Sequence, residues 1–375
     1  MRQRLVVSAA FTVLLLGCSA AASPSPSPSP TPSPAPAWQR VQNLPQSTGG
    51  AALQVVATTS GFAAVGSGGL RGPGTVWTST DGTTWQATPG ETSLSTMLLT
   101  AVAPTPTGLA AFGANCPATG ECIAVNVVTF DGSTWSQPGL LTLPAGIISG
   151  APARFATIGG QIVGVGSMIV TDDPFTQAAV VWTSPTDSDW TQVPDSPIFA
   201  KAQMYDVAVG AHGLVAVGSA DTTSQIGTDA AVWTSPDGLT WTRVPSDPSF
   251  VDAAMNGISA TASGFVAVGQ GPLGAAVWTS ADGTAWVRVA DQPAFQNATM
   301  YGVASDGSGL VAAGYGHDSA AILTSPDGTT WTRVPDGPAF AMAQAVSVAA
   351  NGGRVVVAGR ANGETSPQAI IWSKH

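Results

Sequence analysis

Five aspartates lie in nearly identical surroundings and are the first candidates for chemistry in this protein. The stretch "WTSPDGLTW" from Trp233 recurs as "WTSTDGTTW", "WTSADGTAW" and "LTSPDGTTW", from Trp77, Trp278 and Leu323. Such carboxylates could ligate a metal ion or act as general acids and bases. A turn accounts for them better, because Pro sets φ, Asp accepts bonds from nearby backbone N–H groups and Gly adopts the left-handed conformation. We therefore predict that the repeated carboxylates are scaffold: Asp81, Asp131, Asp237, Asp282 and Asp327.

These turns belong to a unit that repeats along most of the sequence. A second phrase, Gly-apolar-x-Ala-Val-Gly, ends at glycines spaced 45 to 53 residues apart, which are Gly66, Gly113, Gly166, Gly218, Gly269, Gly314 and Gly359. Residue alternation predicts four strands per unit, at about 205–210, 214–218, 230–234 and 240–244 in the fourth. The period is typical of propeller blades, so the predicted fold is all-β, a seven-bladed β-propeller of four-stranded blades.

The two ends of the repeat predict how the ring closes. The seventh unit stops at "AIIWSKH", after its third strand. The domain begins with "WQRV" at Trp38, which matches the fourth-strand phrase "WTRV" at Trp241 and Trp331. We expect Trp38–Val41 to complete the last blade, which removes an exposed sheet edge.

The repeated turn resembles the Asp-box of the BNR-repeat family, found in sialidases and related propellers. The family pattern is Ser-x-Asp-x-Gly-x-Thr-Trp, and the turn here is one residue shorter between Ser and Trp. The resemblance covers the turn between third and fourth strands of most blades and implies a structural turn on the rim, away from the ligand face. The third blade has "SPTDSDW" without Gly, so its turn must differ.

Other charged residues also follow the repeat. Arginines share one place on the fourth strand, namely Arg40, Arg243, Arg288 and Arg333. Aspartates precede a common Pro-x-Phe in the link between blades, namely Asp195, Asp247, Asp291 and Asp336. We expect exposed ion pairs or turn caps that each contribute little stability.

The N-terminus predicts export and anchoring. Arg2 and Arg4 precede an apolar run over 5–16, which ends in "LLGC" and resembles a bacterial lipobox. The resemblance implies a signal peptide over 1–17 and a lipidated Cys18; the alternative is an ordinary signal peptide with an incidental Cys. The Ser/Pro-rich segment 18–37 predicts an extended stalk below a propeller over 38–375. The expected location is extracytoplasmic, with the protein lipid-anchored to the cell membrane.

The net charge and the cysteines limit which classes of partner and metal site we expect. The formal net charge of −10 argues against nucleic acid and against direct adhesion to anionic lipid, so the membrane is expected to be reached through the anchor alone. Outside the cytoplasm, Cys116 and Cys122 predict a disulfide. A metal site is the alternative, but no His or further Cys lies nearby in the sequence.

Residues that break the repeat are the candidates for binding. The position twelve before each marker glycine is mixed and is expected to face the channel: Gln54, Ala101, Arg154, Asp206, Gly257, Gly302 and Ser347. The few tyrosines should lie on the same face. The predicted ligand-binding set is Arg154, Tyr205, Asp206, Asn256, Gln270, Tyr301, Tyr315, His317 and Arg360. Aromatic rings beside hydrogen-bonding groups suit a sugar or a peptide, although an ordinary channel mouth with Arg154 paired to Asp206 is the alternative.

No cofactor, metal site or catalytic residue is predicted. Calcium binding is the alternative for the acidic loop residues on this face, but a solvated surface explains them better: Asp172, Asp173, Asp221, Asp229 and Asp318. The favoured function is a non-catalytic, monomeric binding propeller for a protein or glycan of the cell envelope.

The alternative function is a sialidase-like or other glycoside hydrolase. The resemblance implies six blades, three arginines on the substrate carboxylate and a Tyr activated by Glu. This protein departs from that pattern, because it has seven repeats and no Glu accompanies Tyr205 or Tyr301 on a first strand.

Overall fold

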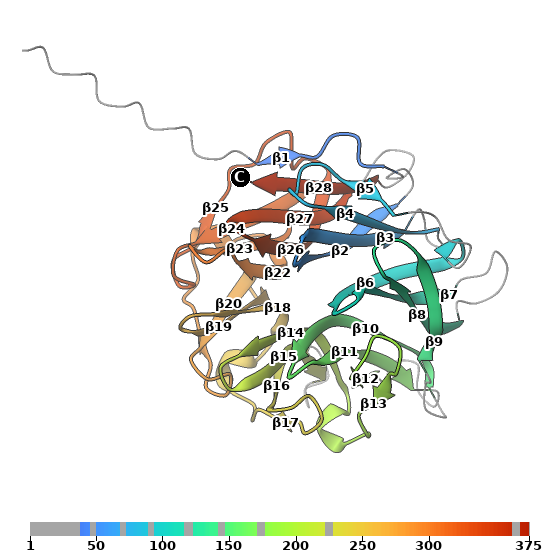
Figure 1. The fold of residues 1–375 in the computed structure, drawn as a ribbon. Coiled ribbons are helices and arrows are strands. Elements are labelled where there is room, and N and C mark those ends of the chain that lie inside the picture. The colour runs from blue at the N-terminus through green and yellow to red at the C-terminus, as the bar shows by residue number, and fades with distance from the viewer. Residues whose placement is uncertain are drawn as a thin grey trace, which may run out of the picture. The chain divides into compact units, whose positions relative to one another are not determined.

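The protein is a seven-bladed β-propeller, as the repeat predicts. The computed structural model describes residues 38–45, 50–67, 73–88, 94–115, 123–141, 147–170, 177–221, 228–361 and 368–374. Within these ranges the strands form seven four-stranded antiparallel sheets. Figure 1 shows the sheets arranged as blades around a central axis, in sequence order.

The blades are numbered 1 to 7 by their first strands, which lie nearest the axis (Figure 1). The first strands are β2 (Ala51–Thr58), β6 (Met97–Thr105), β10 (Ile147–Ile158), β14 (Ala202–Gly210), β18 (Ala254–Thr261), β22 (Thr299–Ser305) and β26 (Ala343–Asn351). The second strands are β3 (Gly61–Ser67), β7 (Gly108–Asn115), β11 (Gln161–Val170), β15 (Gly213–Asp221), β19 (Gly264–Gly271), β23 (Leu310–Gly316) and β27 (Arg354–Ala361).

The outer strands differ in length. The third strands are β4 (Gly74–Ser79), β8 (Ile123–Phe130), β12 (Gln177–Ser184), β16 (Thr228–Ser235), β20 (Gly274–Ser280), β24 (Ser319–Ser325) and β28 (Gln368–Lys374). The fourth strands are β5 (Gln86–Ala87), β9 (Trp135–Leu141), β13 (Thr191–Gln192), β17 (Thr242–Arg243), β21 (Val287–Arg288), β25 (Thr332–Arg333) and β1 (Gln39–Arg40). Short 3-10 turns lie in three of the links: η2 (Pro197–Phe199), η3 (Pro248–Phe250) and η4 (Pro293–Phe295).

Ring closure follows the sequence prediction. β1 pairs antiparallel with β28, with Gln39 opposite Ser373 and Arg40 opposite Trp372. The backbone N–H of Val41 donates to the carbonyl of Ile371 at 2.8 Å and extends this pairing by one residue. The N-terminal strand therefore completes the sheet formed by the last three strands in the sequence.

The core is a set of hydrophobic clusters that join one blade to the next. A tryptophan on the third strand is fully buried in five blades, as Trp77, Trp182, Trp233, Trp278 and Trp372. Four of these indoles donate to a carbonyl in the preceding link; Trp233 Nε1, for example, bonds to Ile198 O at 2.9 Å. In these four blades the buried ring thus fixes the preceding link as well as the blade itself.

The marker glycines are required by close backbone approach. A Cβ at Gly218 would lie 1.8 Å from the carbonyl oxygen of Gln203 on the adjacent first strand. At Gly359 the corresponding distance to Gln344 O is 2.0 Å. A side chain at either position would push the first and second strands apart, so the repeat of Gly has a packing cause.

The repeated aspartates are bound within their own turns. In blade 4, Asp237 Oδ1 accepts from the backbone N–H groups of Leu239 and Thr240 at 2.8 and 2.7 Å. Gly238 has φ +80°, and its N–H donates to Ser235 Oγ at 2.8 Å. The same bonds to the carboxylate occur at Asp81, Asp131, Asp282 and Asp327. We call this hairpin the box turn.

Blade 3 has a different turn, as its missing Gly predicts. Its Thr186 Oγ1 accepts from the N–H groups of Ser188 and Asp189 at 3.3 and 3.2 Å. Asp187 instead reaches blade 2, where it accepts a hydrogen bond from the Thr107 hydroxyl.

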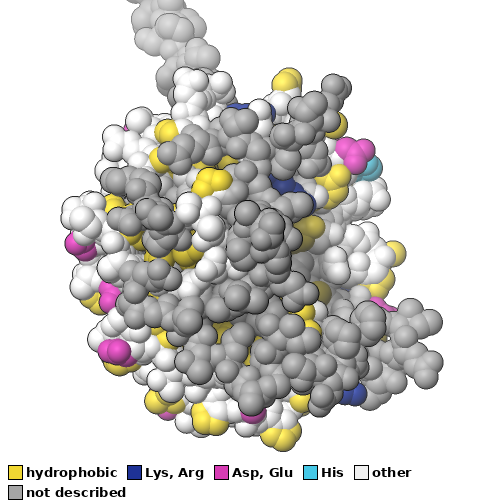
Figure 2. All heavy atoms as spheres, turned by 90° about the vertical axis from the view of Figure 1, so that its right-hand side faces the viewer, with side chains coloured by type: hydrophobic (Ala, Val, Ile, Leu, Met, Phe, Trp, Pro, Cys, Tyr) yellow, Lys and Arg dark blue, Asp and Glu magenta, His cyan; other side chains and the backbone are white. Residues whose placement is uncertain are grey.

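The repeated Arg and Asp residues form weak local contacts. Arg288 and Asp291 lie 3.8 Å apart, and Arg333 and Asp336 lie 3.5 Å apart. Asp247 caps η3 by accepting from Ser249 N. On the face turned to the viewer in Figure 2, the coloured acidic and basic side chains are scattered rather than gathered in one patch.

Several predictions fall outside the described residues. They are the signal peptide 1–17, Cys18, the Ser/Pro-rich segment to position 37, the pair Cys116 and Cys122, and the loop aspartates Asp172 and Asp173. In the part of the protein that the structure describes, no helix has the length and apolar character needed to cross a membrane.

Candidate functional site at the channel mouth

A β-bulge in every blade shapes the channel mouth. The register between first and second strands shifts by one residue at the same place each time, for example between Met204 and Asp206 in blade 4. The residues passed over are Leu53, Thr100, Ala153, Tyr205, Asn256, Tyr301 and Val346. Bulges of this kind re-aim a side chain out of the sheet pattern.

Most of these bulge residues line one cavity of about 460 Å³. We call it the channel mouth, and its lining residues are Ala51, Ala52, Leu53, Ala153, Arg154, Tyr205, Asn256, Tyr301, Gln344, Val346 and Arg360. All but Arg360 come from first strands. The cavity has the volume of a small-ligand site.

The structure brings five of the nine predicted residues together in this cavity: Arg154, Tyr205, Asn256, Tyr301 and Arg360. Asp206, Gln270, Tyr315 and His317 do not line it. Gln270 and His317 are exposed. Tyr315 donates its hydroxyl to Asp318 Oδ1 at 2.9 Å, and this bond is the main cause of a raised pKa at Tyr315.

In the mixed column twelve residues before each marker glycine, Arg154 lines the cavity, but the other members are not among its lining residues, contrary to expectation. Gln54 and Ser347 are 3% and 4% exposed. Gln54 Oε1 accepts from Val102 N in the next blade at 2.7 Å, and Ser347 Oγ accepts from Val55 N at 3.2 Å. The bulge explains the error, because it turns the residue before this column toward the cavity. Gln54, Asp206 and Ser347 are left against the neighbouring blade.

Asp206 plays the same part between blades 4 and 5. Its Oδ2 accepts from Ile258 N and its Oδ1 from Val207 N, both at 2.9 Å. We call Gln54, Asp206 and Ser347 the seam latches, because each one binds a backbone N–H of the next first strand. Burial raises the pKa of Asp206 to about 6, against the opposing effects of Arg154 and the two N–H bonds.

The Arg154 guanidinium group makes few hydrogen bonds to the described residues. Among the described residues its one hydrogen bond is from Nη1 to Ala153 O at 2.8 Å. It forms no direct ion pair with Asp206 within the described ranges, although the carboxylate partly offsets the lowering of its pKa by burial. The expected Arg154–Asp206 pair is therefore only a longer-range attraction, and most guanidinium N–H groups have no hydrogen-bond partner among the described residues.

The remaining lining residues of the channel mouth supply hydrogen-bond donors and aromatic rings. Arg360 Nε donates to Gln344 Oε1 at 2.9 Å. Within the described ranges, the Gln344 amide N–H groups and the Arg360 Nη atoms make no further side-chain hydrogen bond. Asn256 Nδ2 donates to Met300 O at 2.9 Å and so ties blade 5 to blade 6. Tyr205 bonds to Ser219 at 2.9 Å, whereas the Tyr301 hydroxyl has no hydrogen bond to the described residues.

Sequence reasoning missed Gln344, Leu53 and Val346. The sequence held a signal for Leu53 and Val346, because the bulge residues lie thirteen positions before each marker glycine. Gln344 lies opposite Arg360 on the paired strands β26 and β27. This neighbour relation follows from the strand register and not from a sequence motif. No group of His, Cys, Asp or Glu in the described ranges is arranged to hold a metal ion.

Solved structures with the same fold differ in function. The protein is similar to YCF48, solved bound to a D1 peptide, with a TM-score of 0.56 and 14% identity over 92% of this sequence and 96% of that one. It is similar to Trypanosoma rangeli sialidase in complex with sialic acid, with a TM-score of 0.51 and 12% identity over 91% of this sequence and 59% of the sialidase.

A third neighbour also acts on sugars. An α-L-arabinofuranosidase from Fusarium graminearum, solved with an iminosugar inhibitor, has a TM-score of 0.50 and 14% identity over 90% of this sequence and 96% of that enzyme. No protein-family model and no curated protein matches the sequence. At these identities the likenesses show the β-propeller fold alone.

Proposed function

We propose that this protein is a lipid-anchored, extracytoplasmic binding propeller that holds a peptide of an envelope protein by an anionic group at the channel mouth. The observation behind the proposal is the charge of the cavity. Acids outnumber bases in the whole sequence, 22 to 12, yet the charged residues in the described part of the lining are Arg154 and Arg360. Two guanidinium groups, with no carboxylate among the described lining residues, favour an anionic ligand.

The geometry suits a carboxylate flanked by apolar atoms. Arg154 and Arg360 supply N–H donors, and Tyr301 supplies a hydroxyl without a protein partner among the described residues. The rings of Tyr205 and Tyr301 and the side chain of Leu53 supply apolar surface. The carboxylate would come either from the C-terminus of the peptide or from an acidic side chain within it.

The structural neighbours support a binding role in general terms. YCF48 shares the fold and is bound to a peptide in its structure, so a propeller of this kind is able to hold a peptide. The sialidase and the arabinofuranosidase keep hydrolysis as the alternative. We favour binding, because the described lining of the mouth lacks the two carboxyl groups that most glycoside hydrolases use.

Anchoring remains part of the proposal and rests on the sequence. The charged start, the apolar run and the "LLGC" phrase support export and lipidation at Cys18, and the Ser/Pro-rich segment supports a stalk. Labelling the protein with a palmitate analogue in its host would test this, and a Cys18→Ala variant that still labelled would contradict it.

The binding proposal is tested with a library of short peptides in two forms, free acid and C-terminal amide, titrated against the full-length protein in detergent. A ligand at about one hundred times its dissociation constant adds roughly 2.7 kcal/mol to stability, which a thermal shift detects. We expect acidic peptides to bind more weakly as salt rises. Loss of binding on amidation identifies a C-terminal carboxylate, and retention identifies an acidic side chain.

Variants locate the site. We expect Tyr301→Ala and Arg360→Gln to weaken peptide binding at least about tenfold, or 1.4 kcal/mol. Arg354→Gln is the matched control, since Arg354 is an exposed residue at the opposite end of β27. Equal effects of Arg360→Gln and Arg354→Gln, or no peptide binding at all, would overturn the proposal.

A further inference from the structure

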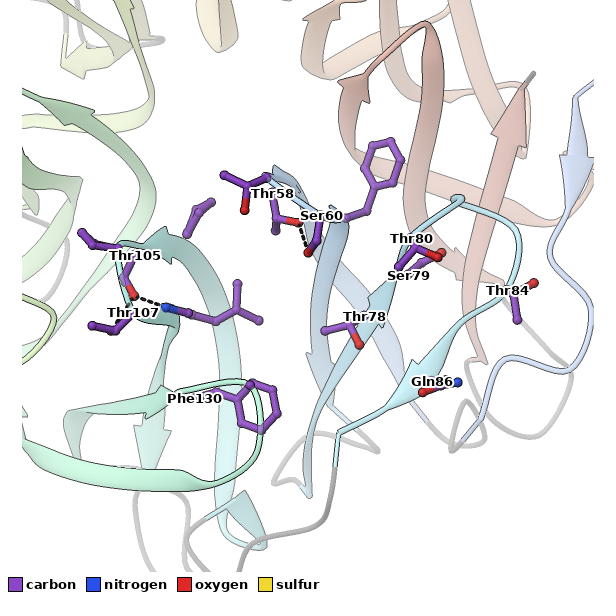
Figure 3. Close-up of a pocket in the computed structure, with 17 residues that line it drawn as sticks. Thr58, Ser60, Thr78, Ser79, Thr80, Thr84, Gln86, Thr105, Thr107 and Phe130 are labelled. Atoms are coloured by element: carbon purple, nitrogen blue, oxygen red, sulfur yellow. Dashed lines mark hydrogen bonds between the residues drawn. The ribbon is translucent and has the colours of Figure 1, made fainter.

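A second cavity, of about 550 Å³, lies between blades 1 and 2 at the opposite ends of the first strands from the channel mouth. We call it the blade 1–2 groove. Its lining residues are Thr58, Thr59, Ser60, Phe62, Thr78, Ser79, Thr80, Thr84, Gln86, Pro104, Thr105, Pro106, Thr107, Gly108, Leu109, Phe130 and Gly132. Figure 3 shows Thr58, Ser60 and Thr78 on one side of it and Thr105 and Thr107 on the other.

The groove lies where the box glycine of one blade does not press on the blade before it. In blades 1, 4, 5 and 6 a Cβ on the box glycine would come within 2.4 to 2.8 Å of a valine of the preceding blade, so those turns press on their neighbours. The pairs are Gly82 with Val356, Gly238 with Val163, Gly283 with Val215 and Gly328 with Val266. A Cβ on Gly132 in blade 2 would meet nothing within 4 Å.

Two changes in sequence produce this difference. Ala63 occupies the place of the valine in blade 1, three residues before the marker glycine. The box turn of blade 2 reads "TFDGSTW", one residue shorter than "TSTDGTTW" in blade 1, and Phe130 stands at the end of its third strand where Ser79 stands in blade 1. A smaller side chain and a shorter turn together leave the seam open.

The shortened turn also leaves a buried donor unpaired. Box tryptophans in four other blades donate Nε1 to the carbonyl of the box glycine, as Trp85 does to Gly82 at 3.0 Å. Trp135 is 7% exposed, and its Nε1 has no hydrogen-bond partner among the described residues. An unmet buried donor costs about 1–3 kcal/mol, so blade 2 departs from the repeat at a cost in stability.

The described lining is rich in hydroxyl groups and holds no charged side chain. Nine of its residues bear a hydroxyl, and none of those named above is Asp, Glu, Lys, Arg or His. The side-chain hydroxyls of Thr59, Thr78, Thr80 and Thr84, and the amide of Gln86, make no hydrogen bond to the described residues. Hydroxyls both donate and accept, and a ligand rich in hydroxyls matches them at every position.

We propose that the blade 1–2 groove is a second binding site, for an uncharged oligosaccharide. Neutral hydroxyls line it, and Phe62, Leu109 and Phe130 supply apolar surface for the C–H face of a sugar ring. Anionic glycans are disfavoured by the net charge of −10 and by the neighbouring box carboxylates Asp81 and Asp131.

An extended peptide fits the groove less well. Strand addition needs a free sheet edge, and the edge strand β5 has only two residues. A peptide held by its C-terminal carboxylate or by an acidic side chain would need a positive charge, and the described lining has none. The groove therefore favours sugar over peptide.

The test is binding of the full-length protein, in detergent, to an array of neutral and anionic glycans, followed by calorimetric titration of the best neutral oligosaccharide. We expect Thr78→Val combined with Thr84→Val to lower its affinity at least about tenfold. Thr324→Val combined with Thr330→Val is the matched control, because these residues hold the same two positions in blade 6. That control should bind as the wild type does.

The outcomes separate this site from the channel mouth. Tyr301→Ala should leave the oligosaccharide affinity unchanged while it weakens the peptide. The groove proposal is overturned if no neutral glycan binds, if both Thr→Val pairs have equal effects, or if proline-rich peptides bind in the groove and sugars do not. None of these results would contradict the peptide proposal, because that proposal rests on Arg154 and Arg360 in the channel mouth.

Discussion

At the scale of single residues, three different side chains at the same position of the repeat make the same contact between neighbouring blades. Gln54, Asp206 and Ser347 each accept from a backbone N–H of the next blade, across seams between strands that are distant in sequence. Asp206 alone among them titrates, and it does so beside Arg154 in a desolvated place. The neutral latches carry no such pH dependence.

The pKa of Asp206 predicts how this latch changes with pH. The folded pKa of about 6 lies above the unfolded value of about 3.9, so its contribution to stability is full below pH 4 and is lost as the pH rises through 6. We expect the free energy of unfolding of the wild type, minus that of Asp206→Ser, to fall by about 2–3 kcal/mol between pH 4 and pH 7. Urea unfolding across this range measures it, and a flat difference would show that the pKa is not raised.

At the scale of elements, the box turn is a self-contained unit. Its aspartate accepts from two N–H groups of its own turn, which ties the carboxylate to the scaffold. The bulge is the opposite kind of element, since it directs Tyr205, Asn256 and Tyr301 into the mouth. The box turn repeats the same residues and stabilises the blade. The bulge repeats only its backbone geometry, so its side chain differs from blade to blade.

The box turn predicts a different pH dependence. The N–H groups of Ala285 and Thr284 lower the pKa of Asp282 to about 2, so its contribution is present above about pH 4 and is lost as the pH falls through 2. We expect Asp282→Ala to lower stability by roughly 0.5–1 kcal/mol at pH 7, an effect that shrinks toward pH 2 in urea unfolding. Asp291→Ala, which removes an exposed ion pair, is the control and should change less. An Asp282→Ala protein that lost peptide binding would instead place function on the rim.

At the scale of the whole molecule, the ring depends on two ends of the sequence meeting. β1 covers the edge of β28, a strand of seven residues, and Trp38 packs edge-on against Phe340 at 6.4 Å. Without β1, the backbone groups along β28 would form an open edge, which is a template for pairing with other molecules.

Removal of the closing strand is therefore expected to destabilise the propeller. We expect deletion of residues 38–41 to lower the melting temperature by about 5–10 °C and to produce oligomers on size-exclusion chromatography. Deletion of residues 30–33 in the Ser/Pro-rich segment shortens the protein equally and should leave both unchanged. Closure would be unimportant to stability if the two deletions melted alike.

The features predictable from the sequence are those that repeat locally. Blade number, box turns, marker glycines and the closing strand follow from short phrases, because each unit meets the same backbone geometry and so selects the same residues. The fourth-strand phrase at Trp38 sufficed for closure, since β1 copies its counterparts in other blades.

Contacts between blades became visible only in the folded structure. It assigned Asp206 to a seam and not to the mouth, joined Gln344 to Arg360, and opened a groove beside Gly132. These features depend on bulges and on contacts between residues far apart in the sequence, such as Ser347 and Val55, and a local pattern holds no information about which distant side chain it will face.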